Sequence, residues 1–226
     1  MYKQLLTVNS VECKLFATDH PAFLLIQPSA RHEEKADGLN CEAALIETLG
    51  NKGFVLAAFD TVEWARSLMP WHDDAVARDE ETGCHSHATL RFVENDLLPL
   101  LRSRYGDLPC IVGGYSLGAL FALWAAAESS AFCAVAAASP SLWINGWTTY
   151  AQAHPINAQR VYMSLGDREE HCRNERMKRI GDCVRRQHEL LLAQLGDSNT
   201  TLEWNQGGHF GDEAVRTARA FAWCME

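Results

Sequence analysis

Short runs of apolar residues recur along the chain, and stretches with helical spacing separate them. Runs without polar alternation are typical of strands buried on both faces of a sheet. They lie at residues 21–26, 54–59, 110–112, 134–138 and 160–165, and a more polar run follows at 201–204. Ahead of them, residues 3–8 and 11–17 alternate around a turn at Asn9-Ser10, which favours a hairpin.

Between these runs, apolar residues recur every three or four positions, as in amphipathic helices. We expect helices near residues 41–49, from 86 onward, at 117–124, 146–153 and 177–195, and at the C-terminus. The last helix is expected to bury Val215, Ala218, Phe221, Ala222 and Met225. Strands alternating with helices predict an α/β fold: a mostly parallel sheet with helices on both faces. We expect a single domain over residues 1–226.

Composition narrows the class of protein. The chain has 226 residues, and its formal net charge of −9 argues against a nucleic-acid surface, which needs clustered Lys and Arg. Residues 1–6 lack the apolar segment of a signal peptide, and no run is long enough to span a membrane. Eight cysteines without a Cys-x-x-Cys pair predict free thiols in a cytoplasmic protein. His85-Ser86-His87 beside Cys84 is better explained as a polar loop than as zinc ligands, so we expect neither metal nor cofactor.

The segment Gly114-Tyr115-Ser116-Leu117-Gly118 carries the strongest chemical signal. It joins the buried strand at 110–112 to a helix that is apolar nearly all round. A serine at such a turn is held in a strained backbone that exposes its hydroxyl, and the flanking glycines allow close approach of the chain. We therefore interpret Ser116 as a nucleophile in an α/β-hydrolase fold.

A serine nucleophile needs an imidazole to accept its proton and a carboxylate to orient that imidazole. Functional groups of parallel sheets collect at the carboxyl ends of strands. His209 follows the strand at 201–204 and lies near Gly208 and Gly211, which makes it the candidate base. The turn after the strand at 160–165 carries three carboxylates. Among them we favour Glu169, at the fourth position of a Gly-x-x-acid turn, over Asp167 and Glu170.

The oxyanion hole of this fold takes one N–H from the residue after the nucleophile and one from the loop after the strand at 21–26. Leu117 supplies the first. In the expected loop, Pro28 has no N–H, so Gln27 or Ser29 must donate the second, and we favour Ser29.

These segments resemble the esterase D-type family of α/β-hydrolases, in its siderophore-esterase-like branch. The resemblance extends from about residue 20 to the C-terminus. It rests on Gly-Tyr-Ser-Leu-Gly with Ala-Leu-Phe-Ala, on Ala138 to Trp143, on the Gly166 to Glu169 turn and on the Gly-His before the last helix. Gln27-Pro28 stands where the family has His-Gly, and the chain is short, with little room for a lid. The resemblance implies acyl-ester chemistry at Ser116, a glutamate-type acid at Glu169 and His209 as base.

The segment from Arg66 to Trp71 resembles the substrate-facing loop of that branch. Trp64, Trp71, Trp143 and Trp147 lie on segments expected at the mouth of the site, where they either wall an acyl pocket or pack as ordinary core. Arg66 either holds an acidic group of the substrate or lies on the surface. The function we expect is a serine carboxylic-ester hydrolase acting on a small-molecule ester. The alternatives are an acyltransferase or thioesterase with the same triad, and an inert binding scaffold.

Overall fold

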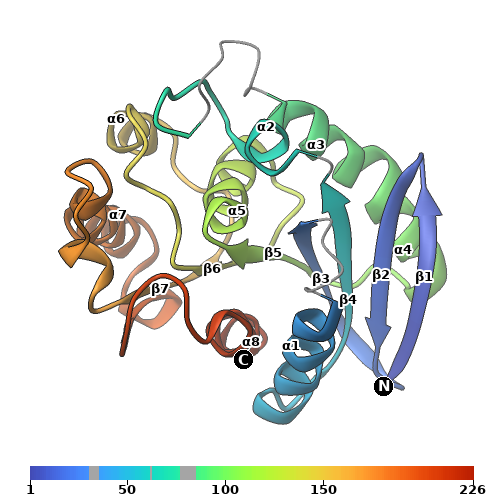
Figure 1. Ribbon diagram of the computed structural model, residues 1–226. Coiled ribbons are helices and arrows are strands. Elements are labelled where there is room, and N and C mark those ends of the chain that lie inside the picture. Colours follow the sequence, from blue (N-terminus) through green and yellow to red (C-terminus); the bar gives the residue numbers. More distant parts are fainter. Residues whose placement is uncertain (31–35, 62, 77–84) are drawn as a thin grey trace.

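The computed structural model describes residues 1–30, 36–61, 63–76 and 85–226 (Figure 1). Its strands form one eight-stranded sheet in the order β1-β2-β4-β3-β5-β6-β7-β8. Their bounds are β1 (Tyr2–Val8), β2 (Val11–Ala17), β3 (Pro21–Ala30), β4 (Gly53–Thr61), β5 (Cys110–Tyr115), β6 (Ala134–Ala138), β7 (Arg160–Gly166) and β8 (Thr200–Asn205). The β1–β2 and β2–β4 pairs are antiparallel and the other pairs are parallel, which confirms the predicted fold and the hairpin.

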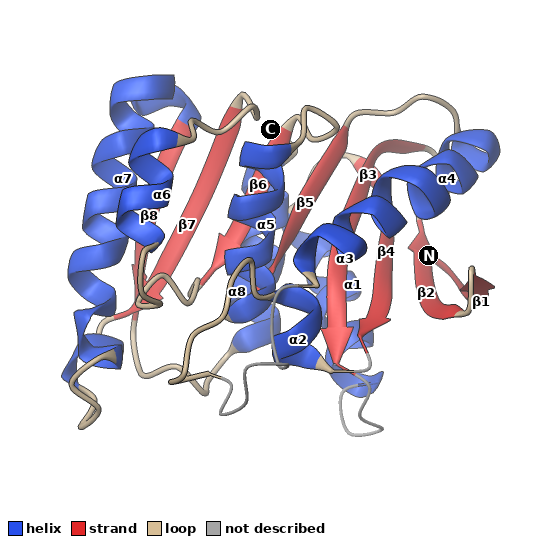
Figure 2. Cartoon of the chain, turned by 90° about the horizontal axis from the view of Figure 1, so that it is seen from above, coloured by secondary structure: helices blue, strands red, loops and turns tan. Residues whose placement is uncertain are grey.

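Helices cover both faces of this sheet (Figure 2). One face carries α2 (Trp64–Leu68), α3 (Ser86–Phe92), α4 (Leu98–Tyr105), α5 (Leu117–Glu128), α6 (Trp147–Ala153) and α7 (Ile180–Leu195). The other face carries α1 (Ala36–Leu49) and α8 (Glu213–Cys224). Side chains along β3 alternate between the two cores, since Leu24 and Ile26 join the first and Leu25 joins the second. The unbroken apolar runs of the sequence therefore mark strands buried on both faces.

The helix expected from residue 86 is a composite. A π-helical turn, η2 (Val93–Leu97), separates α3 from α4. Pro99 stands at the start of α4 and has no N–H to continue the regular ladder, and a proline of this kind commonly accompanies such a turn.

The strand expected at 21–26 is longer than the sequence indicated. The supposed loop Gln27-Pro28-Ser29 continues β3 to Ala30, so that prediction was wrong. Beyond Ile26, β3 still pairs with β4, whereas its pairing with β5 has ended. Because that side of the strand has lost its partner, a proline is tolerated there without leaving a ladder bond unmade.

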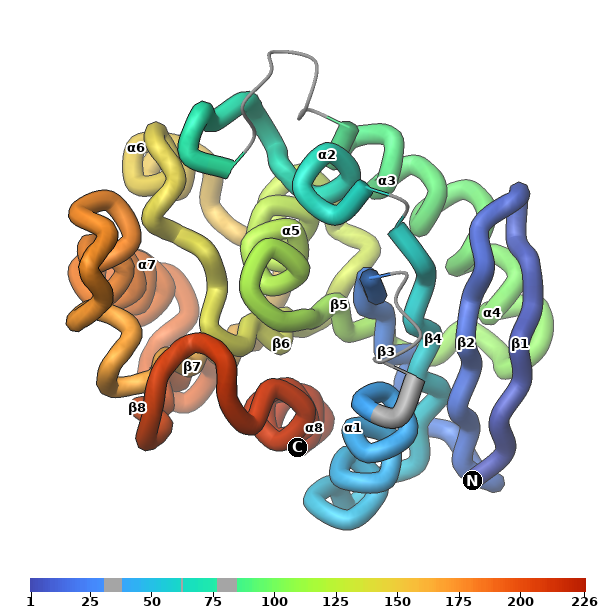
Figure 3. Tube along the Cα trace, viewed as in Figure 1, coloured from blue at the N-terminus to red at the C-terminus, as the bar shows by residue number. Residues whose placement is uncertain are grey.

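Of the five residues that the closing helix was expected to bury, Ala218, Phe221 and Met225 are buried. Val215 and Ala222 are only half-buried, whereas Arg216, Thr217 and Ala220 are buried beside Ala218 and Phe221. The buried face thus includes Arg216, which contacts Tyr115 at the end of β5 and Glu169 after β7. Figure 3 shows α8 beside the part of the sheet formed by β5, β6 and β7.

The cysteines and the lengths of the helices were also subjects of prediction. Each of the seven cysteines in the described residues is a free thiol, and Cys84, part of the Cys-His-Ser-His segment, lies outside those residues. Among the described residues, no helix combines the length and the apolar character that crossing a bilayer requires.

Candidate active site

Ser116 lies at the junction of β5 and α5 in a conformation that only a sharp turn imposes. Its φ of 58° and ψ of −117° are in a sparsely populated region for a residue with a side chain. A Cβ on Gly114 would lie 3.0 Å from the carbonyl carbon of Gly118, and a Cβ on Gly118 would lie 3.1 Å from Cγ of Pro28. A side chain at either position would need its neighbour to shift, so both glycines are closely packed, as expected for a nucleophile turn.

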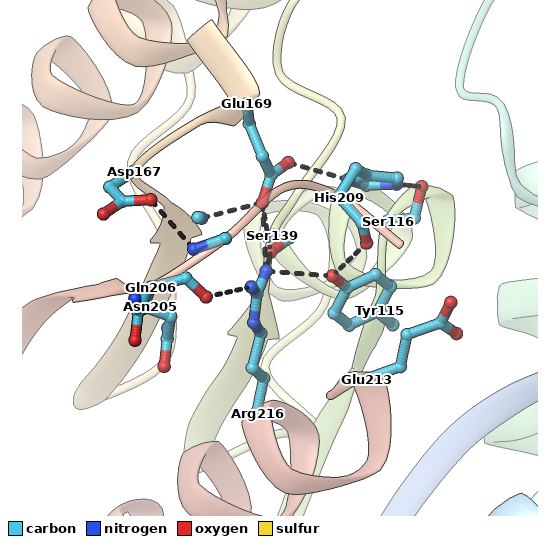
Figure 4. A network of polar contacts seen from close by, with 12 residues as sticks. Tyr115, Ser116, Ser139, Asp167, Glu169, Asn205, Gln206, His209, Glu213 and Arg216 are labelled. Carbon is cyan, nitrogen blue, oxygen red and sulfur yellow. Dashed lines mark hydrogen bonds and ion pairs between the residues drawn. The ribbon is translucent and has the colours of Figure 1, made fainter. Parts of the chain in front are cut away.

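Three side chains from separate loops meet in one hydrogen-bonded line (Figure 4). His209 Nε2 lies 2.9 Å from Ser116 Oγ, and His209 Nδ1 lies 2.7 Å from Oε2 of Glu169. The carboxylate can only accept, so Nδ1 donates and Nε2 is left free to accept the serine proton. This is the geometry that a serine nucleophile with a general base requires.

The Glu169 carboxylate is buried and held by several donors. Its Oε1 accepts from the backbone N–H of Gly166 at 2.7 Å, from Ser139 Oγ at 2.9 Å and from Arg216 Nη1 at 3.2 Å. Burial by itself raises the pKa of Glu169, but the hydrogen bonds from His209, Gly166 and Ser139 outweigh it and hold the pKa below its ordinary value. Glu169 is thus ionised near neutral pH.

The other two carboxylates of this turn have different partners. Asp167 Oδ1 accepts from the backbone N–H of Gly207 at 2.8 Å, which ties this turn to the loop carrying His209. Glu170 pairs with Arg185 on α7 at 2.8 Å. The structure therefore brings Glu169, among the three, to the imidazole.

A layer of polar groups supports the histidine from below. The Tyr115 hydroxyl donates to the backbone carbonyl of His209 at 2.6 Å, and the two rings lie 5.3 Å apart. Arg216, which is 2% exposed, donates to that hydroxyl at 3.2 Å and to the backbone carbonyl of Gln206 at 3.3 Å. Sequence reasoning missed Arg216. The available signal was its alignment with Ala220 and Cys224, spaced by four along the buried side of α8.

Two serines after β6 also went unassigned. Ser139 has φ of 45° and directs its hydroxyl to Glu169, while Ser141 Oγ lies 3.2 Å from Ser116 Oγ. Both belong to the Ser-Pro-Ser segment that the resemblance singled out. Their contacts show that this segment contacts both the candidate nucleophile and the candidate acid.

Two cavities meet at Ser116 and share Trp64, His209 and Phe210 in their walls. The larger, of about 530 Å³, is mostly apolar. Its apolar walls include Val76, Leu117, Pro140, Trp143, Met177 and Ile180. The smaller, of about 320 Å³, is more polar. Polar side chains in its wall are Gln27, Ser29, Glu42, Glu213 and Thr217. The candidate nucleophile therefore faces apolar space on one side and polar space on the other.

Glu42 is the buried acid of the smaller cavity. Its Oε1 accepts from the Gln27 amide at 2.7 Å. Burial is the largest cause that raises the pKa of Glu42; the Gln27 hydrogen bond lowers it and the charge of Glu213 raises it, and together they bring it to about 8. Near neutral pH this carboxyl is largely protonated.

The residues expected to bind substrate divide into two groups. Trp64 and Trp143 line the cavities beside Ser116. Trp71 and Trp147 line neither cavity. They stack on each other with ring centroids 6.3 Å apart, and their indole N–H groups donate to Asn145 and Gln187. Arg66 lies on the surface, paired with Glu63 at 3.3 Å, so the structure does not bring it to the site.

The predicted oxyanion donors flank the nucleophile. Leu117 begins α5 and lines the larger cavity, while Ser29 lies near the end of β3 and lines the smaller one. The backbone carbonyl of Ser29 accepts from the Thr61 hydroxyl at 3.2 Å. Leu117 and Ser29 remain predictions as oxyanion donors.

Solved structures with the same fold include several hydrolases. An IroE-like serine hydrolase from Shewanella oneidensis has a TM-score of 0.78 at 13% identity, covering 98% of this chain and 79% of its own. Siderophore hydrolase EstB from Aspergillus nidulans has a TM-score of 0.73 at 18% identity, covering 100% and 94%. The enterobactin esterase FES from Shigella flexneri has a TM-score of 0.66 at 15% identity, covering 99% and 59%. At such identities the likeness establishes the α/β-hydrolase fold.

No curated protein matches the sequence. A family model does: the one described as "Putative esterase" matches residues 42–211. That range begins in α1 and contains Ser116, Glu169 and His209 together with the Ser139 to Trp143 segment. Since the match spans most of the chain, the protein belongs to this esterase family.

Proposed function

We propose that the protein hydrolyses carboxylic esters through an acyl-enzyme on Ser116, with His209 as base and Glu169 as its carboxylate partner. The observation that carries the proposal is the continuous line from Ser116 Oγ to His209 at 2.9 Å and from His209 to Glu169 at 2.7 Å. Membership of the esterase family and the strained turn at Ser116 support it.

The reaction follows from these contacts. Ser116 Oγ attacks the ester carbonyl while its proton passes to His209 Nε2, and the negative charge develops on the carbonyl oxygen. The Leu117 N–H and a donor at the end of β3, for which we favour Ser29, stabilise that oxygen. His209 then gives its proton to the departing alcohol. Water repeats the sequence on the acyl-enzyme, releasing the acid and restoring Ser116.

The two cavities define the substrate we expect. The apolar walls at Trp143, Met177 and Ile180 suit an aromatic or branched acyl group, and the larger cavity has room for it. The Glu213 carboxyl and the Thr217 hydroxyl on the other side suit hydroxyl groups of the alcohol part. Some of the structural neighbours are hydrolases of siderophores, so siderophore esters belong among the substrates to be tested.

The decisive experiment compares wild type with Ser116→Ala on p-nitrophenyl esters from acetate to octanoate and benzoate. We expect Ser116→Ala to remain folded and to lose on the order of 10⁶ in turnover. Ser130→Ala, at an exposed serine beyond α5, serves as the matched control and keeps full activity. A fluorophosphonate probe should label wild type and Ser130→Ala but not Ser116→Ala. Unchanged turnover in Ser116→Ala would overturn the assignment.

A further inference from the structure

Arg216 is a buried cation that contacts the Glu169 oxygen not bonded to His209. Its Nη1 lies 3.2 Å from Glu169 Oε1, from Ser139 Oγ and from the Tyr115 hydroxyl. Its Nη2 donates to the backbone carbonyl of Gln206 at 3.3 Å (Figure 4). Arg216 lines neither cavity beside Ser116. A buried charge is costly unless it is paired, so this guanidinium serves the groups that surround it.

Those groups are the supports of the candidate base. Glu169 holds the Nδ1 side of the His209 ring, and Tyr115 holds the His209 backbone carbonyl. Gln206 lies three residues before His209, on the loop that carries it. The planar Arg216 guanidinium, with several fixed donors, thus contacts Glu169, Tyr115 and Gln206 at once. A lysine ammonium could not reproduce this arrangement.

We propose that Arg216 is a positioning residue of this site: it fixes Glu169 and the His209 loop, and its charge lowers the pH at which His209 becomes protonated and inactive. This inference rests on the proposed function, because it concerns the same base. The role is distinct from substrate binding, since the guanidinium reaches His209 only through Glu169, Tyr115 and Gln206.

The sign follows from the order of charges. The carboxylate of Glu169 lies between two groups, with Oε1 towards Arg216 and Oε2 towards His209. The guanidinium neutralises part of the carboxylate charge and repels a second positive charge on the imidazole. Without it, the unbalanced carboxylate favours imidazolium, and the acidic limb of kcat/KM moves to higher pH. Coulomb's law with an effective dielectric constant of about 20 gives roughly one pH unit for a charge ~12 Å away and more for a closer one, so about one pH unit is the smallest shift we expect.

The remaining charged and titratable groups around the pair are the same in wild type and variants. They come from four segments: Tyr115 at the end of β5, Asp167 and Arg168 in the turn after β7, Glu213 on α8, and Glu42 on α1. A change caused by replacing Arg216 is therefore assigned to Arg216 itself.

The test compares Arg216→Met, Arg216→Gln and Arg216→Lys with a matched control, Arg219→Met. Arg219 lies on the same helix but is exposed and pairs with Glu203 at 2.9 Å. The measurements are kcat and KM from pH 5 to 9, thermal denaturation, and the titration of the His209 imidazole followed by NMR. The NMR titration does not need turnover. Failure of the proposed function, seen as activity retained by Ser116→Ala, is thus distinguished from failure of this inference.

In the neutral variants we expect the acidic limb and the His209 titration to move up by about one pH unit or more. We also expect kcat to fall at least tenfold while KM stays within twofold. Arg216→Lys keeps the charge, so its limb stays within about 0.3 pH units of wild type although kcat falls; Arg219→Met changes neither. A merely structural role would lower the melting temperature without moving the limb. An unmoved limb in a folded neutral variant overturns the proposal. If the neutral variants do not fold, Arg216→Lys provides the test: a shift of its acidic kcat/KM limb by a full pH unit would overturn the proposal.

Discussion

Replacing Glu169 with glutamine changes one atom and, by the contacts at this site, reverses the polarity of His209. Three donors converge on Oε1, from Gly166, Ser139 and Arg216. The single oxygen of a glutamine will therefore occupy the Oε1 position, which directs its NH₂ group at His209 Nδ1. That nitrogen must then accept, so the ring proton moves to Nε2, the atom that faces the serine hydroxyl. The imidazole remains in place but can no longer take the serine proton.

The size of the effect follows from this change of tautomer. In the well-studied serine protease triad, the corresponding acid-to-amide change lowers kcat by about 10⁴ with the geometry intact. We expect a loss of about 10⁴ here, which corresponds to about 5 kcal/mol in the activation barrier. The amide keeps the shape of the carboxylate but leaves the buried Arg216 without its counter-charge, so the variant should fold with a lowered melting temperature.

Asp167→Asn is the matched control, two residues away in the same turn. Its amide oxygen can still accept from the Gly207 N–H, and the side chain has no contact with the imidazole, so kcat should fall less than tenfold. The assay is kcat for p-nitrophenyl butyrate at pH 8, with circular dichroism to verify the fold. If Glu169→Gln retains activity within tenfold of wild type, or if Asp167→Asn is the more damaged protein, Glu169 is not the partner of His209.

Three further predictions follow from the cavities and the buried acids. Trp143→Ala should lower the ratio of kcat/KM for p-nitrophenyl benzoate to that for the acetate about tenfold, because Trp143 lines the larger cavity. Trp71 lines neither cavity, so Trp71→Ala should leave this ratio unchanged, and equal ratios in the two variants would contradict the assignment of the larger cavity to the acyl group. Ser139→Ala removes one of the donors to Glu169 and should lower kcat about tenfold without changing KM more than twofold, and unchanged kcat would remove Ser139 from the network. For Glu42, the unfolded chain ionises near pH 4.5 while the folded protein keeps the proton to about pH 8, so wild-type stability falls across this window by at most about 5 kcal/mol. Glu42→Gln should therefore raise the melting temperature at pH 8.5 more than at pH 5, and an equal change at both would show that Glu42 ionises normally.

The sheet could be predicted because its central strands are buried on both faces. In such strands, for example at residues 134–138, no polar position interrupts the apolar run, and the pattern marks the strand to within a residue. The nucleophile turn could be predicted for a related reason. A strained serine flanked by close-packed glycines has few other uses at a strand-to-helix junction, so residue type and place agree. Glu169 and His209 were inferred from the general rule that parallel strands deliver their chemistry at their carboxyl ends.

The predictions that failed concern contacts that the local sequence does not encode. Pro28 ends a regular strand in most contexts, and it is accepted in β3 only because the neighbouring strand has already ended. Trp71 and Trp147 carry the same aromatic signal as Trp143, yet they pack on each other, and only the three-dimensional path of the chain separates the two outcomes.

Arg216 shows most clearly why a site is harder to predict than a fold. Helical periodicity assigns arginine to the solvent side, because burying a charge is unfavourable in the absence of a partner. The partner here is Glu169, which lies 47 residues earlier in the chain and on a different element. Once that carboxylate is present, the cost of burying the arginine is offset by the ion pair and by the hydrogen bonds to Ser139 and Tyr115. Each charge is thus tolerated in the interior because the other is present. A prediction that considers residues one at a time can find Glu169 from its place after a strand, but it assigns Arg216 to the surface.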